Sequence, residues 1–172
     1  MSIQDELKAC VAKKRLVPFA PSPPISVYRP VFLVPSVNDQ VVGPWDNRSD
    51  DSLSMPFVRA DLEHFIMGAF VTAAFGRKPK AGFRRLSQKK RGIPIVWEMR
   101  ITASKVQYRI IGMFPERDVF IGAEMWCRDL INFEEEIDKA TSLWEGWFPG
   151  FSPVRSDNIH DYISENVVLL RQ

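Results

Sequence analysis

The chain has 172 residues and a formal net charge of +2, and 45% of its residues are hydrophobic. This length fits a single domain, because domains cluster near roughly 100–150 residues, and the many Phe and Trp residues exclude global disorder. The acidic start argues against a signal peptide, and no stretch is long and apolar enough for a membrane helix. Two cysteines without the spacing of a disulfide framework favour a reducing compartment, so we expect a cytoplasmic protein with no membrane partner.

The N-terminal region is predicted to wrap the surface instead of forming a core of its own. Residues 3–16 can form a short helix, and residues 17–56 hold eight of the thirteen prolines. The β-rich run in this region is 27–34, and Pro30 restricts it to an edge strand or an extended segment, because proline cannot donate to a sheet ladder.

A helix is predicted over residues 59–75, where apolar residues follow the helical stripe and Gly76 is well placed to end it. The stripe consists of Leu62, Phe65, Ile66, Ala69, Phe70 and Ala73. Residues 77–91 then carry eight basic side chains and no acidic one. Such a segment is either a solvated surface or a contact for a polyanion.

Three strands with period-2 alternation follow, over residues 94–103, 106–114 and 118–125. Two-residue hairpin loops would place Arg100 opposite Arg109 and Arg109 opposite Glu124. The same register puts Trp97, Tyr108 and Ile121 on one apolar face, against which the preceding helix would pack.

An apolar stripe from Leu130 to Trp147 predicts a second helix, and residues 167–170 can add a late strand. The order of helix, meander and helix predicts an α+β fold with a three- or four-stranded antiparallel sheet packed by helices. In this division residues 1–57 form an N-terminal Pro-rich extension, residues 58–128 the core, and residues 129–172 a C-terminal helical extension that packs on the core.

Two arginines directly across a sheet repel each other, so the predicted pair of Arg100 and Arg109 calls for negative charge. Glu98 or Glu124 can supply it within the protein, as a structural ion network. Alternatively, a phosphate lies between the arginines, since a guanidinium fork matches phosphate oxygens. Both interpretations stay open at the level of the sequence.

Four short runs in the predicted core resemble the RelE/ParE superfamily of bacterial toxins, over about residues 58–128. They are Phe83-Arg84-Arg85-Leu86, Val96-Trp97-Glu98-Met99-Arg100-Ile101, Tyr108-Arg109-Ile110-Ile111 and Asp118-Val119-Phe120-Ile121. In that family a basic segment precedes the strands, and a small antiparallel sheet is packed by N-terminal helices. RelE-like members cut messenger RNA on the ribosome, and ParE-like members inhibit gyrase.

The resemblance implies a toxin-like RNA-binding protein, with a ribosome-associated, metal-independent endoribonuclease as its catalytic form. RNA or the ribosome would be its partner, together with an antitoxin or another protein. The catalytic candidates are Arg100 and Arg109, for stabilising the transition state, and Glu98 and Glu124, for taking a proton. The nucleic-acid-binding candidates are Arg84, Arg85, Lys89, Lys90, Arg91 and Arg128.

The chain also departs from the family pattern. Its last predicted strand continues into Trp126-Cys127-Arg128-Asp129, which leaves Arg128 as the basic match, and His64 and His160 fall outside the matched runs. No nucleotide-binding loop or metal-ligand motif is present, so we expect no cofactor and no metal. The alternatives are a non-enzymatic accessory protein of a phage or mobile element that binds a protein or nucleic acid, and a structural subunit that docks on an acidic partner.

Overall fold

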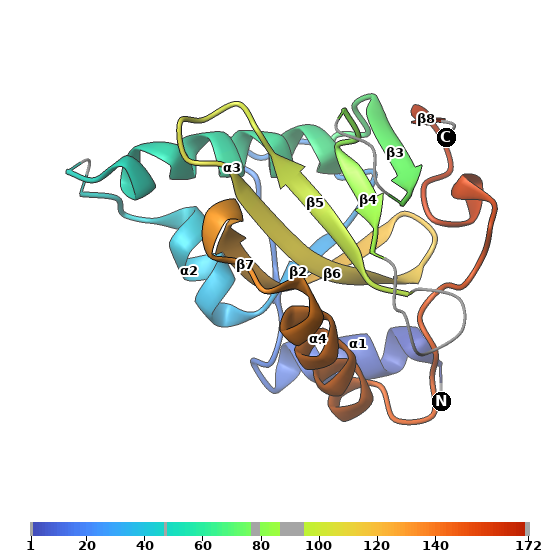
Figure 1. Ribbon diagram of the computed structural model, residues 1–172. Helices are drawn as coiled ribbons and strands as arrows, with labels where there is room; N and C mark the ends of the chain where they lie inside the picture. Colours follow the sequence, from blue (N-terminus) through green and yellow to red (C-terminus); the bar gives the residue numbers. More distant parts are fainter. Residues whose placement is uncertain (1, 47, 77–79, 87–94, 171–172) are drawn as a thin grey trace.

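The structure is a computed structural model that describes residues 2–46, 48–76, 80–86 and 95–170. These residues form an α+β fold with four α-helices and one mixed, mostly antiparallel sheet of eight strands (Figure 1). The helices are α1 (Ile3–Ala12), α2 (Pro35–Val42), α3 (Asp50–Ile66) and α4 (Phe133–Trp147). The strands are β1 (Val17–Pro18), β2 (Val31–Leu33), β3 (Val71–Phe75), β4 (Phe83–Arg85), β5 (Trp97–Ile101), β6 (Tyr108–Glu116), β7 (Val119–Cys127) and β8 (Val167–Leu169).

The predicted α+β class is confirmed, but the predicted small sheet is wrong. The strands lie in the order β1-β2-β7-β6-β5-β4-β3-β8, so five further strands flank the β5–β6–β7 meander. Four of these five are only two or three residues long. Strands of that length are too short for period-2 alternation to be recognised in the sequence.

The meander itself is confirmed, and so is the predicted pairing of Arg100 with Arg109 across β5 and β6. The predicted register between β6 and β7 is wrong, because Arg109 lies opposite Trp126 and Glu124 lies opposite Ile111. Gly112 then pairs with Gly122, which leaves Ala123 as the extra residue of a β-bulge. A bulge changes which residues share a face.

The predicted helix over residues 59–75 is placed too late in the chain. Helix α3 begins at Asp50, after the Ser49 side chain accepts a hydrogen bond from the Ser52 N–H, and ends at Ile66. Gly68 follows with φ of +78°, the left-handed conformation that ends many helices. Residues 71–75, predicted as the last helical turn, form β3 between β4 and β8.

The Pro-rich region contributes to the same sheet as the meander. β2 pairs in parallel with β7 and antiparallel with β1, so it is not the edge strand that Pro30 suggested. Proline is tolerated there because Pro30 directly precedes the strand, and its carbonyl accepts a hydrogen bond from the Phe120 N–H.

Both faces of the sheet are covered by helices, as Figure 1 shows. Helices α2 and α3 pack on one face, with Leu62, Phe65 and Trp97 in the core. Helices α1 and α4 pack on the other, with Trp144 and Ile121 in a second core. The second predicted helix is thus confirmed as α4 and the late strand as β8, whereas Ile121 lies on the face opposite to the one predicted. In the described ranges, no helix could cross a membrane.

Candidate anion-binding site

A cavity of about 520 Å³ opens on the α4 side of the sheet, over β4, β5 and β6 and beside the start of α4. Five arginines and two glutamates line it, so its lining has an excess of three positive charges. The charged residues are Arg84, Arg85, Arg100, Arg109, Arg128, Glu98 and Glu134, and Phe133 stands among them. A cavity with this lining should attract anions.

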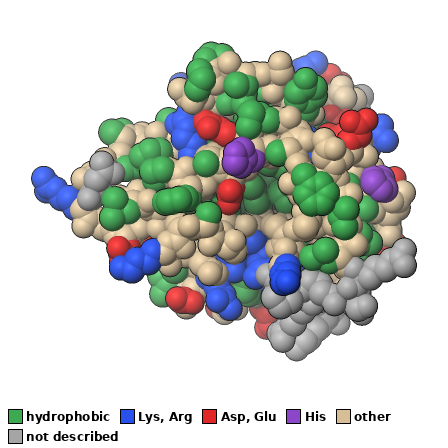
Figure 2. Space-filling view, turned by 90° about the horizontal axis from the view of Figure 1, so that it is seen from above, with side chains coloured by type: hydrophobic (Ala, Val, Ile, Leu, Met, Phe, Trp, Pro, Cys, Tyr) green, Lys and Arg blue, Asp and Glu red, His purple; other side chains and the backbone are tan. Residues whose placement is uncertain are grey.

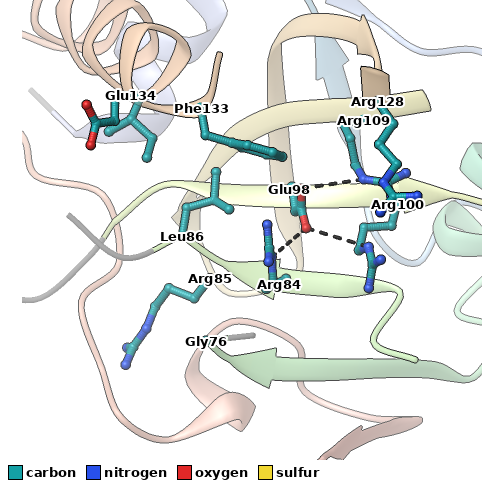
Figure 3. A pocket seen from close by; sticks show the side chains of 11 residues that line it. Gly76, Arg84, Arg85, Leu86, Glu98, Arg100, Arg109, Arg128, Phe133 and Glu134 are labelled. Atoms are coloured by element: carbon teal, nitrogen blue, oxygen red, sulfur yellow. Dashed lines mark ion pairs between the residues drawn. The ribbon is translucent and has the colours of Figure 1, made fainter. Parts of the chain in front are cut away.

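Glu98 lies at the centre of the cavity and is completely buried. Its Oε1 is 2.5 Å from Nε of Arg84 and 3.6 Å from Nε of Arg100, and its Oε2 is 3.6 Å from Nε of Arg109. Figure 3 shows these three ion pairs converging on the one carboxylate. One negative charge is therefore shared among three guanidinium groups.

Strand pairing accounts for this cluster. Arg84 on β4 lies directly opposite Glu98 on β5, and Arg100, two residues after Glu98, lies directly opposite Arg109 on β6. Side chains two residues apart on a strand share a face, so the four side chains converge on one side of three adjacent strands. The alternation Glu98-Met99-Arg100 on β5 thus creates the site.

Burial governs the electrostatics of the cluster. Burial raises the pKa of the Glu98 carboxyl, and attraction to Arg84, Arg109 and Arg100 opposes that rise. Burial also lowers the pKa of Arg100 and of Arg109, against the attraction of Glu98. Arginine nevertheless keeps its charge in proteins, so the positive excess persists at neutral pH.

Arg109 and Arg100 differ in how their guanidinium groups are held. Arg109 is 2% exposed, and it donates hydrogen bonds to the Tyr108 carbonyl at 2.7 Å and to Oε1 of Gln107 at 3.5 Å. The Arg100 side chain is 14% exposed and donates to the Ala81 carbonyl at 3.2 Å. Arg109 is thus fixed at the back of the cavity, and Arg100 is nearer to solvent.

Arg128 and Phe133 form the accessible side of the cavity. Arg128 follows β7, is exposed, and makes no ion pair with any residue in the described part of the chain. Phe133 opens α4, is half-buried, and lies 5.4 Å from the Arg84 guanidinium. A ligand entering the cavity would meet these two side chains first.

The structure separates some of the residues that the sequence grouped together. Arg85 lines the cavity, but its guanidinium turns away from Glu98 (Figure 3). It pairs with Asp157 at 2.9 Å and lies over the Phe75 ring. Glu124 is not among the residues that line the cavity. Burial raises the pKa of the Glu124 carboxyl, and the neighbouring Glu136 raises it further. Lys89, Lys90 and Arg91 lie outside the described residues.

Phe133 is the cavity residue that sequence reasoning assigned elsewhere, because it fits the apolar stripe of α4. The available signal was its position as the first residue of α4, because the buried residues of that helix begin later, at Glu136. Side chains in a first helical turn often project past the packed part of a helix. An aromatic ring beside arginines can then stack on a ligand.

This arrangement is suited to holding an anion. The Glu98 carboxylate is occupied by three arginines and has no exposed surface, and a general base must reach the proton that it removes. Among the residues described, no group of three His, Cys, Asp or Glu side chains is placed to hold a metal ion. Guanidinium groups with a remaining positive excess, by contrast, match a phosphate.

Comparison of the chain with protein-family models, with curated proteins and with solved structures finds no match. The resemblance to RelE/ParE toxins therefore stays a prediction from four short runs of sequence.

Proposed function

We propose that this protein binds RNA by holding a backbone phosphate in the arginine cavity. The observation that carries the proposal is the one buried carboxylate of Glu98 facing the guanidinium groups of Arg84, Arg100 and Arg109, which leaves an excess of two positive charges in the buried cluster. A purely structural ion network would come closer to neutrality, because each uncompensated buried charge costs several kcal/mol. A phosphate would supply the missing negative charge and would pair with planar guanidinium donors.

The surrounding sequence favours a polyanion over a small anion. Gly76 and Leu86 line the cavity, and the chain continues from them with Arg77 and Lys78 and, a few residues further on, with Lys89, Lys90 and Arg91. Basic residues that follow the lining of a phosphate site in the sequence suit a chain of phosphates. Phe133 adds an aromatic surface of the kind on which unpaired bases stack.

Binding without cleavage is the form of the proposal that the cavity supports. The catalytic alternative is a ribosome-associated endoribonuclease in which Glu98 or Glu124 takes the proton. Glu98, however, is enclosed by arginines, and Glu124 does not line the cavity. Neither candidate base is therefore placed to take a proton beside the bound phosphate, and the carboxylate of Glu134, the other glutamate of the cavity, points away from the arginines (Figure 3).

The test compares two arginines whose removal changes net charge equally. Arg128 lines the cavity, and Arg117 is exposed in the turn between β6 and β7, at the opposite end of that hairpin. Binding of a fluorescent single-stranded RNA is measured by anisotropy over a series of salt concentrations. We expect Arg128→Ala to weaken binding and to reduce the salt slope by roughly one unit, and Arg117→Ala to leave both nearly unchanged.

Two results would contradict the proposal. One is a parent protein that does not bind RNA at low salt, and the other is an equal loss of affinity in both variants. Gel analysis of the same samples tests the catalytic alternative, because RNA shortened by the parent and left intact by Arg100→Ala would establish cleavage.

A further inference from the structure

A second, smaller hollow lies on the α3 side of the sheet and shares Arg100 with the arginine cavity. Its volume is about 200 Å³. This is below the roughly 300–1,000 Å³ of ordinary ligand pockets, so it suits a single ring system. The view from the α3 side shows hydrophobic, acidic, histidine and basic side chains gathered around a recess on this face (Figure 2).

Phe70 gives the hollow an exposed aromatic wall. It lies in the turn between α3 and β3, and 64% of it is exposed, although a Phe of this size normally contributes to a core. Beside it, Phe65, Phe83 and Met99 line the hollow and are buried in the core below α3. A flat ligand can therefore lie on an apolar floor against one exposed ring.

Asp61 is a polar group of the hollow that is available to a ligand, beside the exposed His64. It is half-buried on α3 and makes no hydrogen bond or ion pair within the described ranges. Burial raises the pKa of its carboxyl, although the nearby His64 opposes that rise. Thr72, by contrast, already accepts a hydrogen bond from the Gly82 N–H and donates one to the Lys80 carbonyl. An unpartnered, half-buried carboxylate destabilises the fold, which indicates a use in binding.

We infer that this hollow takes one unpaired guanine of the bound RNA, stacked on Phe70 and hydrogen-bonded to Asp61, with its phosphate on the Arg100 side. The inference rests on the proposed RNA binding and names the base that accompanies the phosphate. Arg100 lines both spaces, so a base in the hollow and a phosphate in the cavity can belong to the same strand. Proteins that bind single-stranded RNA combine stacking of splayed bases with hydrogen bonds to the Watson–Crick edges of those bases.

The choice of guanine follows from the chemistry of Asp61. A carboxylate has two acceptor oxygens and no donor when ionised. On its Watson–Crick edge guanine presents two adjacent donors, the ring N1–H and the amino group at C2, which match those two oxygens. Inosine lacks the C2 amino group, and uracil has one ring N–H between two carbonyls, so each offers the carboxylate one donor.

The experiment uses the full chain and short oligouridines that carry guanine, inosine or an abasic site at one central position. Anisotropy at moderate salt should show the guanine oligonucleotide binding at least about fivefold more tightly than the inosine one, as a lost bidentate contact predicts. Asp61→Asn should remove that difference without weakening binding of plain oligouridine. Phe70→Ala should remove the advantage of any base over the abasic site.

Matched controls separate the hollow from general effects on the surface. Phe57 is 45% exposed on α3 and does not line the hollow, and Asp138 is exposed on α4, so Phe57→Ala and Asp138→Asn should leave base preference unchanged. Equal binding of guanine, inosine and abasic oligonucleotides, with the Arg128 salt effect intact, would overturn the guanine site and leave the proposed function standing. Absence of RNA binding by the parent would overturn both. Thermal melts of each variant identify a loss that comes from unfolding.

Discussion

Arg100 and Arg109 lie directly opposite each other on β5 and β6, and each is 3.6 Å from a different oxygen of the buried Glu98 carboxylate. Like charges in directly opposed cross-strand positions destabilise a sheet. Glu98 therefore compensates a repulsion that the strand pairing itself creates. Because Arg84 also pairs with Glu98, one carboxylate serves three cations.

Replacing this carboxylate tests its structural role. Glu98→Gln keeps the size of the side chain and removes its charge, so the three arginines lose their common partner. We expect the free energy of unfolding to fall by about 3–5 kcal/mol, the usual cost of breaking a buried ion pair. Inorganic phosphate should restore part of the loss by occupying the cavity. Urea unfolding with phosphate or chloride at equal ionic strength measures both effects, and an unchanged midpoint in the variant would contradict the interpretation.

Arg109→Lys tests whether Arg109 binds the ligand or supports the site. Lysine keeps the charge but cannot reproduce hydrogen bonds from separate guanidinium nitrogens to Tyr108 and Gln107. Because Arg109 is 2% exposed, we expect this variant to lose stability, by about 1–3 kcal/mol for the unsatisfied buried groups. The same substitution at the exposed Arg128 should leave the melting temperature unchanged. Equal melting temperatures for Arg109→Lys and the parent would show that the buried hydrogen bonds are dispensable.

The raised pKa of the Asp61 carboxyl predicts that the stability of the fold depends on pH. Since burial raises the pKa of this carboxyl in the folded chain, the folded state holds the proton to a higher pH than the unfolded state does. The stabilisation of the folded state by the protonated Asp61 carboxyl is therefore full below the ordinary aspartate pKa of about 4. This stabilisation is lost as the pH rises through the raised pKa. Asp61→Asn should flatten this part of the profile and raise stability at neutral pH. Urea unfolding measures the free energy of unfolding of the parent and of Asp61→Asn between acidic and neutral pH. Parallel curves of this free energy against pH would refute the prediction.

Gly112 is expected to be irreplaceable for steric reasons. A Cβ at this position would collide with the Ile121 carbonyl oxygen and lie 2.6 Å from Cζ of Phe120. Gly112→Ala should therefore destabilise the fold by about 3 kcal/mol or more, at or above the usual cost of an overpacked core. Gly146 on α4 has no atom within 4 Å of such a Cβ, so Gly146→Ala should stabilise by up to about 1 kcal/mol. Thermal unfolding of the two variants should shift in opposite directions.

The sequence predicted those parts of the fold whose patterns are long. The meander and α4 carry extended period-2 and helical stripes, and the structure contains both. The error at residues 71–75 has a physical cause, because Ala69, Phe70 and Ala73 continue the apolar stripe of α3 beyond Gly68, where the helix has already ended. The turn between β6 and β7 lies one residue later than expected, since Glu116 pairs with Val119, and this shift moves the partner of Arg109 from Glu124 to Trp126.

The candidate site was predicted more fully than the sheet that carries it. Arg84, Glu98, Arg100, Arg109 and Arg128 were all singled out in the sequence, and all line one cavity. Their relative accessibility could not be predicted, because it depends on α4 packing over the strands that bear them. For the same reason the sequence did not indicate that Glu98 would be completely buried. The half-buried position of Asp61 depends on the packing of α3 on the opposite face.

The pairing of β2 with β7 ties the folding of the chain's beginning to the synthesis of its middle. Val31 lies beside Phe120 and Leu33 beside Gly122, and at the other side of the sheet β3 meets β8 near the C-terminus. Contacts between such distant segments require large loops to close first, which slows folding. A nascent chain that has not reached residue 119 lacks β7, the parallel partner of β2. Its apolar Phe32 and Leu33 would be exposed to chaperones until the later strands emerge.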